Sequence, residues 1–178
     1  MPAKILKMMI LSLGLSHSLS MAAETTSWKS VYTDTETDCV VWANSNQKAE
    51  IDFSKHECKS FGGYQLYIEG ADLRYSPTLE FKGKTVFSHR EAAFHNLNST
   101  KVEWVYLQHE DETGRGQIEW KGFIFRLAVA RDDGGRDDSK LYAVRLNANK
   151  TCFLGEAKNN EDARNLIKNS QARCDLIR

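Results

Sequence analysis

The sequence predicts a mainly β domain of the α+β class, an antiparallel sheet or small barrel with a C-terminal helix and two disulfides. Short segments in which apolar and polar residues alternate recur between residues 39 and 154, and turn residues separate them. A helical pattern of apolar residues begins after residue 159. An even number of cysteines follows an export signal, which is typical of disulfide-bonded domains: Cys39, Cys58, Cys152 and Cys174.

Residues 1–23 have the features of a cleavable signal peptide. Lys4 and Lys7 precede a short apolar run, and Ser20-Met21-Ala22 is a small-x-small cleavage pattern. The run is shorter than the roughly 20 residues that a membrane-spanning helix needs. We therefore expect residues 24–178 to form one domain that is periplasmic or secreted and not inserted in a membrane. A folded N-terminal helix is the alternative interpretation.

The charge balance disfavours nucleic acid as a partner. The chain carries 24 basic and 24 acidic residues, and loss of residues 1–23 leaves a slight acidic excess. Nucleic-acid binding depends on basic patches that release phosphate counterions. We expect no nucleic-acid partner.

The four cysteines allow three disulfide pairings. We favour Cys39–Cys58 with Cys152–Cys174, because each pair is local and closes a loop of about twenty residues, worth roughly 3 kcal/mol. A zinc site is the alternative, but the chain lacks the close C-x2-C pairs or set histidine spacings of such sites.

The first half of the chain predicts four strands, at residues 39–42, 64–69, 73–81 and 85–87. The strand at 64–69 has apolar residues at every second position, so we expect one buried face. Pro77 cannot donate to a ladder, which predicts an edge or a bulge at that point. Lys82-Gly83-Lys84 forms the turn that follows.

The second half predicts strands at residues 102–107, 117–131, 141–146 and 152–154. The strand at 102–107 is apolar at both parities, so we expect cover on both faces. In the strand at 117–131 the apolar residues change from even to odd positions at Gly122, which predicts a bulge there. Residues 132–140 form a hairpin loop.

The C-terminal segment predicts a helix that begins at Asn159 or Asn160. Acidic residues lie in its first turn and basic residues in its last, an order that suits the helix dipole. Its apolar stripe should dock on the sheet: Ala163, Leu166, Ile167 and Ser170.

No segment has the spacing of a catalytic or metal-binding motif, so we expect no catalytic residue, cofactor or metal. Carboxylates on the predicted strands are interpreted as solvated charges, with a carboxylate pair brought together by the fold as the alternative: Glu69, Asp72, Glu103 and Glu119. The acidic loop at 132–138 suits a hairpin turn, although its carboxylates also resemble ligands for a hard cation.

The candidate binding surface lies on the second and third predicted strands. Aromatic side chains on a rigid sheet suit the binding of sugars or a protein partner. Tyr67 is the best candidate because it shares a face with Gln65 and Glu69. The full candidate set is Tyr64, Tyr67, Asp72 and Arg74.

Two blocks resemble a family of small exported proteobacterial proteins of uncharacterised function. The first runs from Cys58-Lys59-Ser60-Phe61-Gly62-Gly63-Tyr64 to Asp72-Leu73-Arg74, and the second combines Val102-Glu103-Trp104 with Phe123-Ile124-Phe125-Arg126 and the late cysteines. The resemblance implies export, the local cysteine pairing and the fold. A weaker likeness is to periplasmic lysozyme inhibitors: Ser60 to Tyr64 keeps the Ser and Tyr of their S-G-x-x-Y loop but shifts the glycine.

These features favour a non-catalytic periplasmic binding or inhibitor-like module whose partner is an envelope or extracellular protein. The alternatives are an envelope hydrolase built on carboxylates and a structural envelope component.

Overall fold

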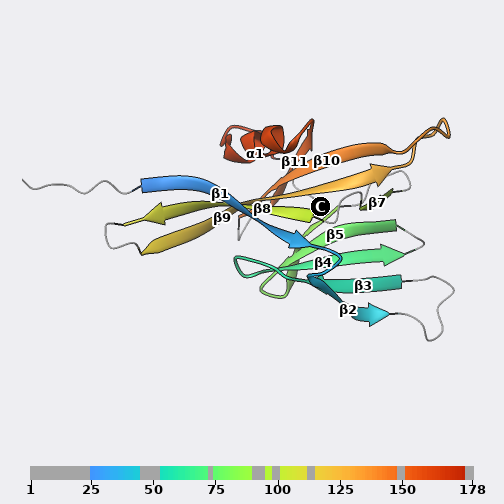
Figure 1. The fold of residues 1–178 in the computed structure, drawn as a ribbon, viewed down its shortest axis with the longest axis horizontal. Helices are drawn as coiled ribbons and strands as arrows, with labels where there is room; N and C mark the ends of the chain where they lie inside the picture. The colour runs from blue at the N-terminus through green and yellow to red at the C-terminus, as the bar shows by residue number, and fades with distance from the viewer. Residues whose placement is uncertain are drawn as a thin grey trace, which may run out of the picture.

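The computed structural model describes residues 25–44, 53–71, 74–89, 95–97, 101–111, 115–147 and 151–174. It is mainly β and ends in one helix (Figure 1). The elements are β1 (Thr25–Asp34), β2 (Cys39–Asn44), β3 (Phe53–Cys58), β4 (Tyr64–Ala71), β5 (Arg74–Phe81), β6 (Lys84–Ser88), β7 (His95–Leu97), β8 (Lys101–Glu110), β9 (Gly116–Val129), β10 (Asp138–Arg145), β11 (Cys152–Ala157) and α1 (Asn160–Lys168). The predicted fold class is therefore confirmed.

The strands form two antiparallel sheets, a division that the sequence did not indicate. Sheet A has the order β1-β8-β9-β10-β11, with β7 also paired to β9. Sheet B has the order β2-β3-β4-β5-β6. Sheet B packs on one face of sheet A and α1 packs on the other, which gives three layers (Figure 1).

The larger core lies between the sheets. In β4, Tyr64, Leu66 and Ile68 point into this core, whereas the residues between them face outward. They meet aromatic and aliphatic side chains of sheet A, of which Trp104 and Phe123 are fully buried. The predicted one-sided strand at 64–69 is therefore confirmed.

β8 is covered on both faces, as predicted. Trp104 belongs to the core between the sheets, and its neighbour Val105 belongs to a second core under α1. Ala163 and Ile167 of α1 are buried in that second core, so the predicted helical stripe docks on sheet A. The side chain of Asn159 accepts a hydrogen bond from the amide of Asp162 and caps the helix as expected.

The bulge predicted at Gly122 is present, because Lys121 is the extra residue in the ladder between β8 and β9. Val105 pairs with Gly122, and the next residue, Tyr106, pairs with Trp120. A Cβ at Gly122 would lie 2.7 Å from Cγ2 of Ile167. Glycine at this position thus lets α1 approach the sheet closely.

The predicted turn after β5 is a tight hairpin, and Pro77 lies within β5. Lys82 and Gly83 have φ angles of 52° and 73°, the left-handed pair that a tight two-residue hairpin requires. Pro77 lies one residue beyond the end of the ladder between β5 and β6, whose last pair is Thr78 with Ser88. Its missing N–H therefore falls outside that ladder.

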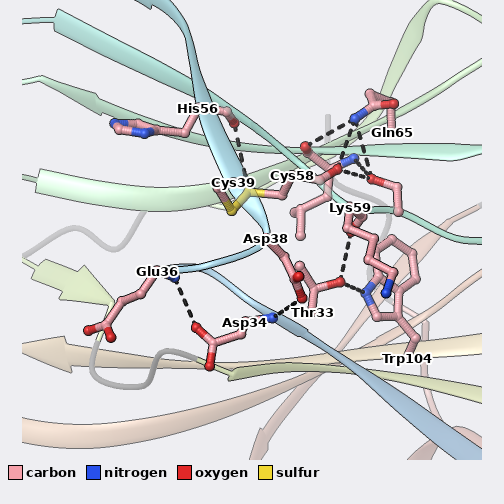
Figure 2. The surroundings of a disulfide bond; sticks show 12 residues. Thr33, Asp34, Glu36, Asp38, Cys39, His56, Cys58, Lys59, Gln65 and Trp104 are labelled. Atoms are coloured by element: carbon pink, nitrogen blue, oxygen red, sulfur yellow. Dashed lines mark hydrogen bonds between the residues drawn. A yellow bond between two sulfur atoms is a disulfide. The ribbon is translucent and has the colours of Figure 1, made fainter.

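Both favoured disulfides are present, Cys39–Cys58 and Cys152–Cys174. The first joins β2 to β3 next to the junction of the sheets (Figure 2). At this junction Trp104 Nε1 donates to Thr33 Oγ1 at 2.9 Å, and Thr33 Oγ1 donates to the carbonyl of Lys59 at 2.7 Å. One buried hydroxyl thus connects β1 and β8 of sheet A to the loop that follows β3 of sheet B.

The predicted signal peptide lies outside the described residues. Within the described part of the chain, no helix is long and apolar enough to span a membrane. The two disulfides fit a protein that matures in an oxidising compartment.

Candidate functional site

The outward-facing surface of β3, β4 and β5 in sheet B carries a connected set of polar side chains. The strand registers place Glu57, Tyr67 and Thr78 in one row across the three strands, and Lys55 and Glu69 in the next. We call this surface the acidic face, defined by Lys55, Glu57, Gln65, Tyr67, Glu69, Thr78 and Glu80.

Lys55 lies at the centre of the acidic face. Its Nζ is 2.9 Å from Oε1 of Glu69, 3.6 Å from Oε1 of Glu80 and 3.7 Å from the centre of the Tyr67 ring. Its side chain is 14% exposed. Burial alone would lower the pKa of Lys55, but the hydrogen bond to Glu69 and the charges of Glu69 and Glu80 outweigh burial and raise it. Lys55 therefore stays charged and does not act as a base near neutral pH.

Tyr67 is held between the ammonium of Lys55 and the surrounding carboxylates. Burial raises the pKa of its phenol, and the charges of Glu80 and Glu57 add to that effect. The hydroxyl therefore stays protonated near neutral pH. Thr78 Oγ1 donates to Oε2 of Glu69 at 3.1 Å, which helps to fix that carboxylate beside Lys55.

The acidic face has more carboxylates than cations. Glu69 and Glu80 contact the ammonium of Lys55, and Glu57 lies opposite Tyr67, so the set of one lysine and three glutamates carries a negative net charge. An aromatic ring within a rigid, negatively charged surface suits a partner that presents cations and hydrogen-bond acceptors.

A shallow groove of about 510 Å³ continues the acidic face toward the Cys39–Cys58 disulfide. Glu57 and Gln65 belong to both, and the groove also includes Val40, which is 67% exposed. Ser60, at the groove wall, uses its hydroxyl internally: it accepts from the amide of Leu66 at 2.7 Å and donates to the carbonyl of Cys58 at 2.7 Å.

The structure separates the members of the predicted binding surface. Tyr67 lies in the acidic face. Tyr64, in contrast, points into the core and is 7% exposed, because β4 alternates and Tyr64 has the opposite parity to Tyr67. Arg74 is exposed at the start of β5, where it pairs with Ala71. Asp72 lies outside the described residues.

The interpretation of Glu103 as a solvated charge is wrong. Glu103 is 1% exposed, and Arg164 of α1 binds both of its oxygens, at 2.5 Å from Nε and 3.1 Å from Nη2. Burial alone would raise its pKa, but hydrogen bonds from Arg164, Asn160 and Ser30 and the charge of Arg164 lower it. The alternating strand pattern could not indicate this, because Arg164 comes from an element sixty residues later.

The acidic loop forms the hairpin between β9 and β10, as predicted. Arg131 binds Asp133 through two hydrogen bonds, and Asp133 also accepts from the amide of Gly135 at 2.9 Å. Within the described ranges, no group of three or more His, Cys, Asp or Glu residues is arranged to hold a metal ion.

Comparisons of the chain with protein-family models, curated proteins and solved structures find no match. The resemblance to small exported proteins therefore stays a prediction.

Lys55 and Glu57, which complete the acidic face, were missed because β3 contains too few apolar residues to show a strand pattern. The available signal for a strand here was the charged pair Lys55 and Glu57 at alternate positions, on either side of His56.

Proposed function

We propose that this protein is an exported, non-catalytic binding module that holds a protein partner with a basic surface on its acidic face. The main support is the arrangement around Tyr67: a half-buried ring under the ammonium of Lys55, between the carboxylates of Glu57, Glu69 and Glu80. Rigid aromatic residues at the centre of a polar patch are frequent anchors of protein interfaces.

The chemistry of the charged groups favours binding over hydrolysis. A carboxylate hydrolase needs one carboxyl group that carries a proton near neutral pH. Glu69 and Glu80 are both ion-paired with Lys55, and Glu103 has a lowered pKa under Arg164. Glu103 is therefore stabilised in its charged form, and Glu69 and Glu80 are engaged in ion pairs.

Affinity capture with the disulfide-bonded protein and its variants tests the proposal. The immobilised protein is incubated with cell-envelope extract, and the retained proteins are identified by mass spectrometry. We expect one reproducible basic partner whose retention falls at least tenfold with Tyr67→Ala or with Glu57→Gln combined with Glu80→Gln. The control Glu156→Gln removes a carboxylate on sheet A and should retain the partner.

Equal retention by all variants would refute the acidic face as the binding surface. Turnover of an envelope substrate that a single carboxylate substitution abolishes would support the hydrolase instead. Stable co-purification with cell-wall or membrane components in large amounts would support a structural role.

A further inference from the structure

A second feature, independent of the acidic face, lies at the edge of sheet A. β10 pairs with β9 from Gly122 to Val129, and the amide of Leu146 donates to the carbonyl of Lys121 at 2.9 Å. In the described part of the chain, the residues of β9 before Lys121 pair with β8 alone. Among the residues that the structure describes, no strand lies beside Gly116–Trp120, where β10 would continue. Figure 1 shows β1, β8 and β9 extending beyond sheet B at this end.

A cavity of about 630 Å³ follows this free edge and reaches both faces of sheet A. Its lining on the α1 side includes Trp28, Leu107 and Lys168. On the opposite side it includes Trp120 and Ile118, the latter 52% exposed. A strand added at this edge would direct its successive side chains to opposite faces of sheet A. A cavity that reaches both faces along the edge can accommodate these side chains.

We propose that the free edge of β9 at Gly116–Trp120 binds an extended acidic peptide segment by strand addition. Every second residue of an edge strand directs its N–H and C=O outward, and these groups supply the backbone contacts in this recognition mode. Five residues of β9 present about 17 Å of edge, enough for a short peptide.

The charges around the cavity determine the character of the peptide. Lys121, Arg145 and Lys168 line the cavity with a single carboxylate, Glu119, so cations exceed anions. Arg145 also donates to the carbonyl of Asn169 at 2.6 Å, which holds it at the end of α1. Acidic side chains of the bound strand face α1 and these cations, and its apolar side chains face Ile118 and Trp120.

Blocked hexapeptides provide the test. Fluorescence anisotropy measures binding of labelled Val-Glu-Val-Glu-Val-Glu and Val-Lys-Val-Lys-Val-Lys to the disulfide-bonded protein. We expect the acidic peptide to bind at least tenfold more tightly at 50 mM salt, with a smaller ratio at 500 mM salt because exposed charges are screened. Hydrogen exchange should show slower exchange of alternate amides between Gly116 and Trp120 in the complex.

Variants separate strand addition from general charge attraction. Lys168→Glu should weaken binding of the acidic peptide at least tenfold, whereas the control Lys158→Glu, an exposed lysine before α1, should leave it unchanged. An acidic peptide in which alternate amides are replaced by esters should bind more weakly, because it lacks the N–H donors. Absent binding of the acidic peptide, binding without amide protection, or equal binding of both peptides would overturn the proposal. A concentration-dependent dimer abolished by Ile118→Lys would assign the edge to a second copy of the chain and would also overturn it.

Discussion

The ion pair between Glu103 and Arg164 attaches α1 to sheet A, and Arg164→Leu tests how much the attachment contributes. In the native structure the guanidinium donates to both oxygens of Glu103, at 2.5 and 3.1 Å, and Asn160 Nδ2 donates to Oε2 at 3.0 Å. Substitution of Arg164 leaves a carboxylate that is 1% exposed without its cation.

The expected loss follows from this burial. Removal of one partner of a buried ion pair costs about 3–5 kcal/mol, because the remaining charge is desolvated and unpaired. The side chain of Arg164 is 34% exposed, so water can reach the site after substitution. We therefore expect the lower limit, about 3 kcal/mol in the free energy of unfolding at pH 7. For a chain of this size the melting temperature should fall by about 6–12 °C.

The loss should depend on pH in a defined direction. Burial alone would raise the pKa of Glu103, but the hydrogen bonds and the charge of Arg164 lower it in the native protein. The native protein keeps this stabilisation above the ordinary carboxyl pKa of about 4.3 and loses it as the pH falls through the lower folded value. In Arg164→Leu, burial dominates and raises the folded pKa, so protonation relieves the destabilisation as the pH falls. The difference in the free energy of unfolding between the native protein and Arg164→Leu should therefore shrink from pH 7 toward pH 4.

Urea unfolding followed by tryptophan fluorescence, with the disulfides intact, measures the difference at pH 7 and pH 4.5. Arg126→Leu is the control, because Arg126 makes an exposed hydrogen bond to Ser139; its effect should stay within about 0.5 kcal/mol. The double variant Glu103→Leu with Arg164→Leu should recover most of the stability, since it buries no unpaired charge. A double variant no more stable than Arg164→Leu, or a loss independent of pH, would refute the reasoning.

Two further substitutions test the junction of the sheets and the bulge. Thr33→Val removes the hydroxyl that accepts from Trp104 and donates to the carbonyl of Lys59, and it should cost about 1–3 kcal/mol in urea unfolding because both buried groups lose their partner. Gly122→Ala places a Cβ against Ile167 and should cost about 1–3 kcal/mol in the same assay. Ile167→Val, combined with Gly122→Ala, should recover part of that loss because it removes a methyl group from the crowded site.

The control for Thr33→Val lies on the same strand. Thr26→Val changes an exposed threonine of β1 and should leave stability within about 0.5 kcal/mol. A loss for Thr33→Val no larger than for Thr26→Val would contradict a bridging role. Full native stability of Gly122→Ala would show that α1 does not depend on close approach at the bulge.

The sequence missed the elements that have few apolar residues. β1 is exposed over most of its length and has apolar residues only at irregular positions, and β3 alternates charged residues with a histidine, so neither shows the pattern of a half-buried strand. β1 forms because it pairs with β8 along its whole length, from Thr25 opposite Glu110 to Asp34 opposite Lys101. Such pairing depends on residues 67 to 85 positions away and leaves little trace in local periodicity.

By itself the sequence determined the features that depend on neighbouring residues. The alternation in β4, the change of phase at Gly122, the cap at Asn159 and the local disulfides each follow from spacing within about twenty positions. The tertiary structure alone decided which strands share a sheet and which charge is buried. Glu103 is a buried ion-pair partner because α1 brings Arg164 to it, and the acidic face exists because β3 places Lys55 beside β4. Both depend on contacts between separate elements, which local patterns do not encode.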